Sequence, residues 1–369
     1  MKTVCKQNSC CGCGACVQTC NKQAINLVDS METLNAVICE DNCIDCGACI
    51  KVCPVNNKLQ MKTPIQWVQG WAKDNNIRKN SASGGFATAI SKKFIENGGY
   101  VCCCVQKNGD FIYKIIDNLN DLCSIAGSKY VKSNTLNTYK EIKTILRNEK
   151  KVLFIGLPCH VAGLLNYIDV SLHGNLYTVD LICHGTPSIK LLCKRLEEKH
   201  YEINQVGKIQ FRINNKFRVY CDEKSLSNPA LLDSYLFTFL RGMNYTYNCY
   251  ECLYAGSKRI SDITIGDSWG SSLGDNEMKD GISLALCQTE KGKSLIEQAD
   301  LYLFPVEIEN AINNNAQLKH PMKLSSKRKK FFKYINNDTT YSAAAYRADI
   351  LVGIRQLIKY ILIKGWRDV

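Results

Sequence analysis

Two runs of cysteine near the amino terminus share one spacing. Each run reads C-x2-C-x2-C-x3-C, and Pro54 follows the second run. The runs are Cys10, Cys13, Cys16 and Cys20, and Cys43, Cys46, Cys49 and Cys53. In bacterial two-cluster ferredoxins each such run supplies three thiolates to one [4Fe–4S] cubane and a fourth to the other cubane. We therefore expect one cluster on Cys10, Cys13, Cys16 and Cys53, and a second cluster on Cys43, Cys46, Cys49 and Cys20.

Three other interpretations of these cysteines are weaker. A disulfide framework is typical of secreted chains, and residues 1–5 do not begin an apolar signal-peptide segment. A zinc ribbon would show two CxxC pairs separated by a longer spacer. Cys39, Cys43 and Cys46 also have the C-x3-C-x2-C spacing of radical-SAM enzymes. Because this pattern lies inside the longer run, we interpret Cys39 as a bystander.

Composition indicates a protein with more than a ferredoxin domain. The chain has 369 residues, 46% of them hydrophobic, which predicts one or two further domains with a sizeable core. Its 22 cysteines, without a secretory signal, predict a reducing cytoplasm as its location. The formal charge of +13 does not by itself indicate nucleic-acid binding, since each cluster with its thiolates carries a net charge of roughly −2. No basic stripe is interleaved with aromatic residues, and we interpret the run 327–330 as a solvated helix face.

The carboxy-terminal segment is amphipathic. No apolar run approaches the length of a membrane span. Apolar residues recur on one helical face at Ile350, Leu351, Ile354, Leu357, Ile358, Ile361 and Leu362, with Arg355, Lys359 and Lys364 on or beside the other face. We expect this helix to pack on its own domain. The alternative is a helix that docks on a redox partner or a membrane surface.

The remaining patterns predict an α+β multidomain chain. We expect a dicluster ferredoxin fold over residues 1–60, an α/β region with βαβ units over 65–150 and 151–310, and a helical tail over 311–369. Strands are predicted at 66–72, 100–105, 151–156 and 176–182, a loop at 78–85, and a helix from Phe86 that ends at Gly98. The adjacent residues Cys102–Cys104 would alternate across a strand, so we interpret them as small buried hydrophobic residues.

Cys159 and Cys183 each follow a predicted parallel strand. Parallel strands end at one edge of a sheet, so we expect both cysteines at that edge. Cys249 and Cys252 form a separate C-x2-C pair, and the four thiolates together match the ligand set of a third cubane. The alternatives are core cysteines at 159 and 183, with a C-x2-C pair that is reduced or binds zinc.

A short glycine-rich loop precedes the predicted helix at Phe86. Ser83, Gly84 and Gly85 would present backbone N–H groups and a helix amino terminus, which is how proteins hold phosphate. The same residues also serve purely local helix capping. The turn at 127–130 adds a cation at Lys129 and a ring at Tyr130.

Five short motifs in this order resemble the beta-subunit family of coenzyme F420 hydrogenases and dehydrogenases. The motifs are Ser83-Gly84-Gly85, Gly127-Ser128-Lys129-Tyr130-Val131, Gly156-Leu157-Pro158-Cys159-His160, Asp180-Leu181-Ile182-Cys183-His184-Gly185 and residues 261–270 around Asp267. The resemblance covers roughly residues 66–310. It implies an iron–sulfur oxidoreductase with an α/β flavin domain that binds FAD, and it favours the third cluster. Bacterial members of the family occur with polysaccharide-biosynthesis genes.

The resemblance suggests roles for several polar residues. Ser83, Gly84, Gly85, Lys129, Tyr130 and Asp267 are the expected FAD-binding residues. Asp267 would hold a ribityl hydroxyl or cap its loop. His160 and His184 could each donate a proton or hydrogen-bond to the flavin, and we favour a hydrogen bond to cluster sulfur.

Two classes of function follow. One is a flavin-dependent reductase that passes electrons between clusters and a small organic electron acceptor. The other is an electron-transfer subunit whose substrate is a redox partner protein.

Overall fold

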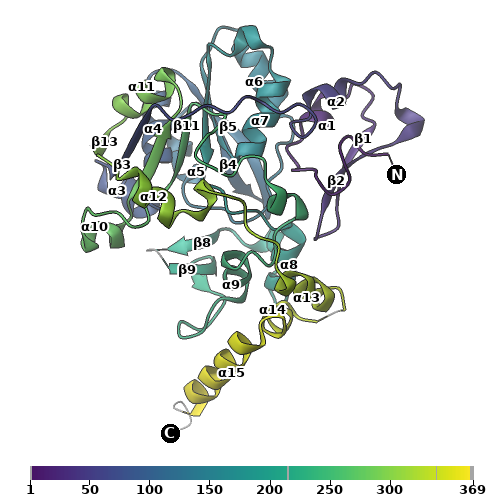
Figure 1. The fold of residues 1–369 in the computed structure, drawn as a ribbon, viewed down its shortest axis with the longest axis vertical. Helices are drawn as coiled ribbons and strands as arrows, with labels where there is room; N and C mark the ends of the chain where they lie inside the picture. Colours follow the sequence, from purple (N-terminus) through teal and green to yellow (C-terminus); the bar gives the residue numbers. More distant parts are fainter. Residues whose placement is uncertain (1, 214–215, 338, 366–369) are drawn as a thin grey trace.

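The computed structural model describes residues 2–213, 216–337 and 339–365 (Figure 1). Its amino-terminal module stands at one side of the body and contains α1 (Ala15–Thr19), β1 (Ile25–Asp29), β2 (Leu34–Ile38) and α2 (Ala48–Val52). The helices α1 and α2 begin directly after Gly14 and Gly47, whose φ angles are 75° and 71°. Only glycine adopts this left-handed conformation without strain, so both glycines allow the tight turn inside each cysteine run.

The body is built on one eight-stranded sheet in the order β13-β3-β12-β11-β7-β6-β4-β5. The strands are β3 (Gln66–Ala72), β4 (Tyr100–Lys107), β5 (Asp110–Ile116), β6 (Val152–Gly156), β7 (Leu176–Leu181), β11 (Ile263–Asp267), β12 (Ser283–Cys287) and β13 (Leu301–Phe304). The central strands β4, β6, β7 and β11 are parallel, and β12 is antiparallel to β11. The carboxyl ends of the four parallel strands therefore form a single edge, where sites gather in α/β sheets.

The register of the sheet places the two isolated cysteines side by side. Gly156 on β6 pairs with Asp180 on β7. Cys159 and Cys183 follow these paired residues at equal distances along the chain, so both lie just beyond the carboxyl edge. The predicted strands at 66–72, 151–156 and 176–182 are confirmed by β3, β6 and β7, and β4 extends the strand predicted at 100–105.

One local prediction was wrong. Residues 78–85 were expected to form a loop, but α3 (Asn75–Asn80) occupies the first part of this segment. The side chain of Asp74 caps α3 by accepting hydrogen bonds from the N–H groups of Asn76 and Ile77. The cap stabilises a helix too short to show apolar periodicity, which is why the pattern did not reveal it.

Helices cover both faces of the large sheet. On one face lie α4 (Phe86–Glu96) and α11 (Glu290–Gln298), and on the other lie α6 (Thr138–Arg147) and α7 (Pro158–Tyr167). The adjacent cysteines of β4 alternate between these faces. Cys103 packs against the core under α4 and α11, whereas Cys102 and Cys104 pack against the core under α6 and α7. The amino-terminal module contacts the second face, since α1 touches both α6 and α7.

A third core lies beyond the carboxyl edge of the large sheet. It contains a three-stranded sheet in the order β10-β9-β8, formed by β8 (Ile209–Ile213), β9 (Lys216–Cys221) and β10 (Lys224–Ser225). Around it pack α8 (Ile189–Glu197), α9 (Ser234–Leu240), α13 (Ser326–Ile335) and α14 (Tyr341–Ala348). The side chains of Phe331 and Tyr341 are fully buried in this core. The segment expected as a helical tail is helical, but α13 and α14 belong to a core. The short helices α5 (Leu122–Ile125), α10 (Asp275–Asp280) and α12 (Ile308–Asn314) complete the body.

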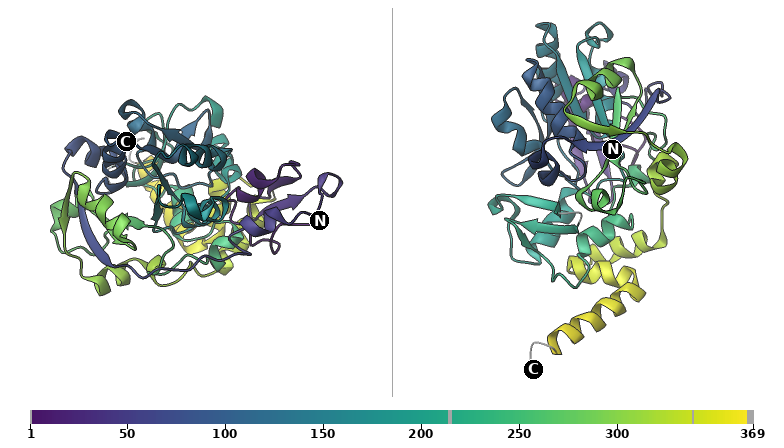
Figure 2. Two further views of the ribbon diagram at one scale, coloured as in Figure 1. Left: turned by 90° about the horizontal axis from the view of Figure 1, so that it is seen from above. Right: turned by 90° about the vertical axis from the view of Figure 1, so that its left-hand side faces the viewer.

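The last helix, α15 (Ile350–Gly365), projects away from the body (Figures 1 and 2). The expectation that its apolar face packs on its own domain was wrong, because Leu351 and Leu357 are 74% and 59% exposed. The helix is held instead on another side, where the side-chain amide oxygen (Oε1) of buried Gln356 accepts a hydrogen bond from the backbone N–H of Leu232. Among the described residues, no helix is long and apolar enough to cross a membrane.

Candidate iron–sulfur site

The first cysteine run and the last cysteine of the second run surround one small cavity. Cys10, Cys13, Cys16 and Cys53 all line this cavity and are each no more than 7% exposed. They are the four thiols that the crossover pattern of a dicluster ferredoxin assigns to one cubane. Cys5 joins the same group, and its hydrogen bonds to Cys10 and Cys53 raise the pKa of its thiol. The fold therefore brings together the predicted ligand set of the first cluster.

The second set of cysteines lies at the surface. Cys46 is exposed, and Cys20, Cys43 and Cys49 are half-buried. Cys20, Cys43 and Cys49 pack against the same small core, so members of both runs gather here. The pKa of the Cys49 thiol is raised, chiefly by burial and to a smaller degree by Cys20 and Cys43. The N–H of Ala24 donates to Cys20 Sγ over 3.4 Å. This site faces the solvent, whereas the first faces the body.

Polar contacts fix the first run on the body. The hydroxyl of Thr135 donates to the carbonyl of Cys13 over 3.0 Å, and the amide nitrogen of Gln18 donates to Thr135 Oγ1 over 3.1 Å. The Lys132 ammonium donates to the carbonyl of Cys11 over 3.3 Å. On α7, a Cβ at Gly163 would lie 2.7 Å from Cys13 Sγ. The module is therefore in close contact with the sheet's covering helices.

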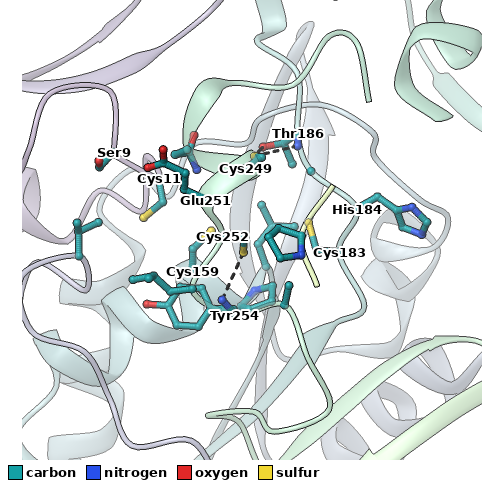
Figure 3. Close-up of a pocket in the computed structure, with 18 of the residues that line it drawn as sticks. Ser9, Cys11, Cys159, Cys183, His184, Thr186, Cys249, Glu251, Cys252 and Tyr254 are labelled. Atoms are coloured by element: carbon teal, nitrogen blue, oxygen red, sulfur yellow. Dashed lines mark hydrogen bonds between the residues drawn. The ribbon is translucent and has the colours of Figure 1, made fainter. Parts of the chain in front are cut away.

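A larger cavity of about 350 Å³ opens at the carboxyl edge of the sheet, beside this contact (Figure 3). Its wall carries the four cysteines expected to bind a third cluster, Cys159, Cys183, Cys249 and Cys252. Cys159 comes from the first turn of α7, Cys183 follows β7, and Cys249 lies in the 3-10 helix Tyr247–Glu251, just before Cys252. Three separate segments therefore converge on one space.

Backbone groups point at two of these sulfur atoms. The N–H of Thr186 donates to Cys249 Sγ and the N–H of Tyr254 donates to Cys252 Sγ, each over 3.4 Å. N–H donors of this kind orient and stabilise thiolate ligands. Among the described residues, no three His, Cys, Asp or Glu side chains are placed to hold a single metal ion. The backbone N–H donors at the sulfur atoms and the volume of the large cavity fit a multi-iron cluster.

Electrostatics also fit a cationic group between these thiols. Burial raises the pKa of the Cys183 thiol to about 12 and that of Cys252 to about 11. Thiols with such pKa values ionise near neutral pH only when a metal centre supplies positive charge. Lys132 on the cavity wall adds one cation: burial alone would lower its pKa, but the Cys249 and Cys159 thiolates raise it overall.

Sequence reasoning missed Cys11. Its side chain lines the large cavity and also touches the small one. Hydrogen bonds from the Cys13 and Cys159 thiols lower the pKa of the Cys11 thiol. Cys11 therefore lies between the ligand sets expected for the first and third clusters. The only signal in the sequence was its position directly after Cys10, outside the regular spacing.

The two predicted histidines have different surroundings. His160 is fully buried behind the cavity wall, where burial lowers its pKa to about 4 and its Nδ1 lies 3.0 Å from the hydroxyl of Tyr113. Its Nε2 atom is buried and has no hydrogen-bond partner in the described structure. His184 lines the cavity, and Figure 3 shows its ring directed away from the cysteines. Burial lowers the pKa of His184, and Asp267 opposes this shift.

Asp267 and Tyr130 lie near His184: Asp267 acts electrostatically on its ring, and the Phe239 ring lies 6.5 Å from the His184 ring and beside that of Tyr130. Both carboxylate oxygens of Asp267 accept from Arg212 Nη1 at 2.9 Å, and the Arg212 guanidinium lies 5.4 Å from the Trp269 ring centroid. Burial raises the pKa of the Tyr130 hydroxyl, while the nearby Arg212 lowers it. Its ring stacks on Phe239 at 4.5 Å between centroids. The rings of Tyr130, Phe239 and Trp269 and the charged pair of Arg212 and Asp267 thus lie together near His184.

The glycine-rich loop reaches the same edge but is packed against protein. The hydroxyl of Ser83 donates to the carbonyl of Ile282 over 2.9 Å. A Cβ at Gly84 would lie 2.3 Å from the carbonyl oxygen of Gly70, so this glycine is required by backbone packing alone. Gly85, with φ 87°, is the residue before α4. Lys129 donates to the carbonyls of Ile125 and Ala126 and so caps α5.

Comparisons with known proteins agree with this architecture. The models of the amino-terminal and carboxy-terminal domains of the coenzyme F420 hydrogenase/dehydrogenase beta subunit match residues 67–140 and 149–303, together more than half of the chain. A 4Fe-4S dicluster domain matches residues 9–57. The chain therefore belongs to the coenzyme F420 hydrogenase/dehydrogenase beta-subunit family, a family of oxidoreductases, and carries an amino-terminal iron–sulfur domain.

Two individual proteins illustrate this relationship. The coenzyme F420-dependent sulfite reductase of Methanocaldococcus jannaschii is 26% identical over 227 residues, which cover 59% of this chain and 34% of that protein. The chain thus spans about a third of the length of this curated relative. A chain of the F420-reducing [NiFe] hydrogenase complex from Methanosarcina barkeri has a TM-score of 0.50 at 20% identity, covering 75% of this chain and 95% of that chain. The structural likeness shows a shared fold.

Proposed function

We propose that this chain is an iron–sulfur flavoprotein that conducts electrons through three [4Fe–4S] clusters between its surface and an FAD at the carboxyl edge of the sheet. The observation that carries the proposal is the large cavity, whose wall combines Cys159, Cys183, Cys249 and Cys252 with Cys11 of the dicluster domain. A cavity shared by both parts of the chain links them into one conduit.

The order of the conduit follows from which sets of cysteines are neighbours, since Cys11 lies between the first set and the large cavity. The cluster on Cys20, Cys43, Cys46 and Cys49 would lie at the surface, where a redox partner can reach it. The cluster on Cys10, Cys13, Cys16 and Cys53 would lie against the body. The cluster in the large cavity would come third, next to His184. Electrons can pass in either direction along this series.

The flavin belongs beyond the third cluster, on the side where His184, Tyr130 and Asp267 gather. Flavins exchange electrons with organic substrates in pairs and with cubanes singly. Arg212, held by Asp267, offers a cation to an anionic cofactor or substrate there. His184 would position the flavin or move a proton at it. His160, fully buried, would instead support the cluster wall through Tyr113.

The Ser83–Gly85 loop and Lys129 remain proposed contacts for the FAD pyrophosphate. Support for this role comes from the place of the loop at the same sheet edge, at the start of α4. The hydroxyl of Ser83 and the ammonium of Lys129 already have protein partners, so the backbone N–H groups that begin α4 are the donors available for phosphate.

Anaerobic purification tests the proposal directly. The holoprotein should contain about twelve iron atoms per chain and one equivalent of flavin. FAD titration of the flavin-depleted protein should show weaker binding for Asp267→Ala, whereas Asp275→Ala, on exposed α10, should bind as the wild type does. A holoprotein that has iron but binds no flavin would leave only the iron–sulfur part of the proposal standing.

A second candidate is an electron-transfer subunit that serves a partner protein and has no organic substrate of its own. The exposed side chains of Ile44 and Ile50, 64% and 50% exposed beside Cys46, favour it. Anaerobic assays with organic acceptors distinguish the two, since only the first candidate oxidises or reduces one in the absence of a partner.

A further inference from the structure

The exposed face of α15 is continuous and apolar. Seven aliphatic residues on it are between 51% and 74% exposed: Ile350, Leu351, Ile354, Leu357, Ile358, Ile361 and Leu362. Their spacing places them on one side of a helix of 3.6 residues per turn. The opposite side faces the body through Val352 and the buried Gln356. No described residue of the chain covers the aliphatic stripe, and a patch of this kind marks an interaction surface.

The charges around the stripe have one sign. Arg355 and Lys359 are exposed along one margin, and residues 350–365 contain no Asp or Glu. The neighbouring α13, at the same end of the molecule in Figure 1, exposes Lys329, Lys330 and Lys333. Long basic side chains beside an aliphatic stripe can extend to a layer of anions while their stems stay on apolar surface.

We propose that α15 is an interfacial anchor that binds the surface of a membrane rich in anionic lipids. The aliphatic stripe would enter the boundary between headgroups and acyl chains, with the helix axis parallel to the surface. Arg355 and Lys359 would meet the lipid phosphates, and the lysines of α13 would add long-range attraction.

A second copy of the chain fits this surface less well. Pairing two α15 helices along their stripes would bring Arg355 and Lys359 of both copies together, and α15 has no acidic residue to compensate them. An anionic lipid surface would instead attract Arg355 and Lys359. A helix that lies at the interface also agrees with the absence, among described residues, of a helix that could span a bilayer.

Vesicle flotation of the holoprotein tests the anchor. The wild type should float with phosphatidylcholine vesicles that contain phosphatidylglycerol, bind less to vesicles of phosphatidylcholine alone, and lose much of the difference at high salt. Leu357→Glu with Ile358→Glu should abolish flotation, because charge then enters the apolar stripe. Arg355→Gln with Lys359→Gln should reduce binding to anionic vesicles and flatten its salt dependence.

A matched variant separates the effect of the stripe from a general effect of added charge. Val170→Glu changes an apolar residue that is 81% exposed on another part of the surface, and it should float as the wild type does. Iron content and far-UV circular dichroism establish that each variant is folded. Failure of the wild type to bind anionic vesicles overturns the proposal. The proposal is also overturned if the wild type self-associates without binding vesicles and the variant Leu357→Glu with Ile358→Glu no longer self-associates. A second copy of the chain would then cover the stripe.

Discussion

Cys11 connects two groups of cysteines that are far apart in the sequence. Its backbone belongs to the dicluster domain, and its thiol contacts the Cys13 and Cys159 thiols. Each of those two residues is an expected ligand of a different cluster. A side chain between two ligand shells shortens the path for an electron, and it also excludes water from the space between them.

We predict that Cys11→Ala leaves the iron content unchanged but slows electron transfer from the first to the third cluster several-fold. The reason is that alanine keeps the backbone turn and the Lys132 contact to the carbonyl of residue 11, but removes the sulfur atom between Cys13 and Cys159. Rapid-mixing reduction followed by freeze-quench EPR measures the step. Loss of about four iron atoms from this variant would instead identify Cys11 as a ligand.

At Gly84, a structural role can be tested apart from a role in cofactor binding. We predict that Gly84→Ala destabilises the protein by about 1–3 kcal/mol even without flavin, because its Cβ would overlap the carbonyl oxygen of Gly70 and the nitrogen of Ser283. Denaturant unfolding of the flavin-free protein measures the change. Gly174→Ala, where nothing lies within 4 Å of the new Cβ, is the matched control and should be close to neutral. Equal stability of the two variants would contradict the packing argument.

Spacing along the chain reveals some site residues but not others. The grouping of these cysteines around common cavities was predictable, because thiolates that share a cubane follow a narrow spacing and because Cys159 and Cys183 each follow an apolar strand. Lys132 had no signal, since one lysine in a loop is ordinary. Its place beside Cys249 and Cys159 exists only once the sheet, α7 and the segment 245–254 are assembled.

At the scale of elements, the third set of cysteines depends on one anchored segment. The 3-10 helix Tyr247–Glu251 is held at both ends: the N–H of Thr246 donates to the carbonyl of Thr186, and the Tyr250 hydroxyl donates to the carbonyl of Gly242. These bonds bring Cys249 and Cys252 to the ends of β6 and β7.

Cys252→Ser should therefore remove one cluster and leave two. We expect iron to fall from about twelve to about eight atoms per chain, because the other ligand sets lie in the amino-terminal module. Cys123→Ser, at an exposed thiol outside both cavities, is the control and should keep its full iron content. Iron and acid-labile sulfide analysis of anaerobic protein decides the matter, and zinc at this site would contradict the cluster.

Apolar patterns gave the buried parallel strands, because such strands are continuous runs of Val, Leu and Ile. They did not predict the order of the strands. In the sheet, β3 lies between β12 and β13, which come from the carboxy-terminal end of the α/β region. Nor did they distinguish α13, whose Phe331 and Phe332 fill a core, from α15, whose apolar stripe is bare. Both helices are amphipathic, and only tertiary contacts determine which stripe is covered.

At the scale of the whole molecule, the three cysteine sets form a series of neighbours. The set around Cys46 is at the surface of the amino-terminal module, and the set around Cys13 lies where that module meets the body. The large cavity, with its half-buried cysteines, follows at the carboxyl edge of the sheet. Such a series lets a protein donor or acceptor reach the exposed set around Cys46, while the set around Cys13 stays buried between the module and the body.

The exposed end should be the docking site for a redox partner protein. We predict that Ile44→Glu with Ile50→Glu lowers kcat/KM for electron exchange with a ferredoxin-type partner at least several-fold, because buried apolar side chains at the centre of an interface contribute most to binding. The same variant should be reduced by dithionite at the wild-type rate, since a small reductant needs no docking surface. Stopped-flow absorbance at the cluster bands measures both rates. Val170→Glu provides the matched surface control, and equal slowing with dithionite would mean that the cluster itself, rather than docking, had been disturbed.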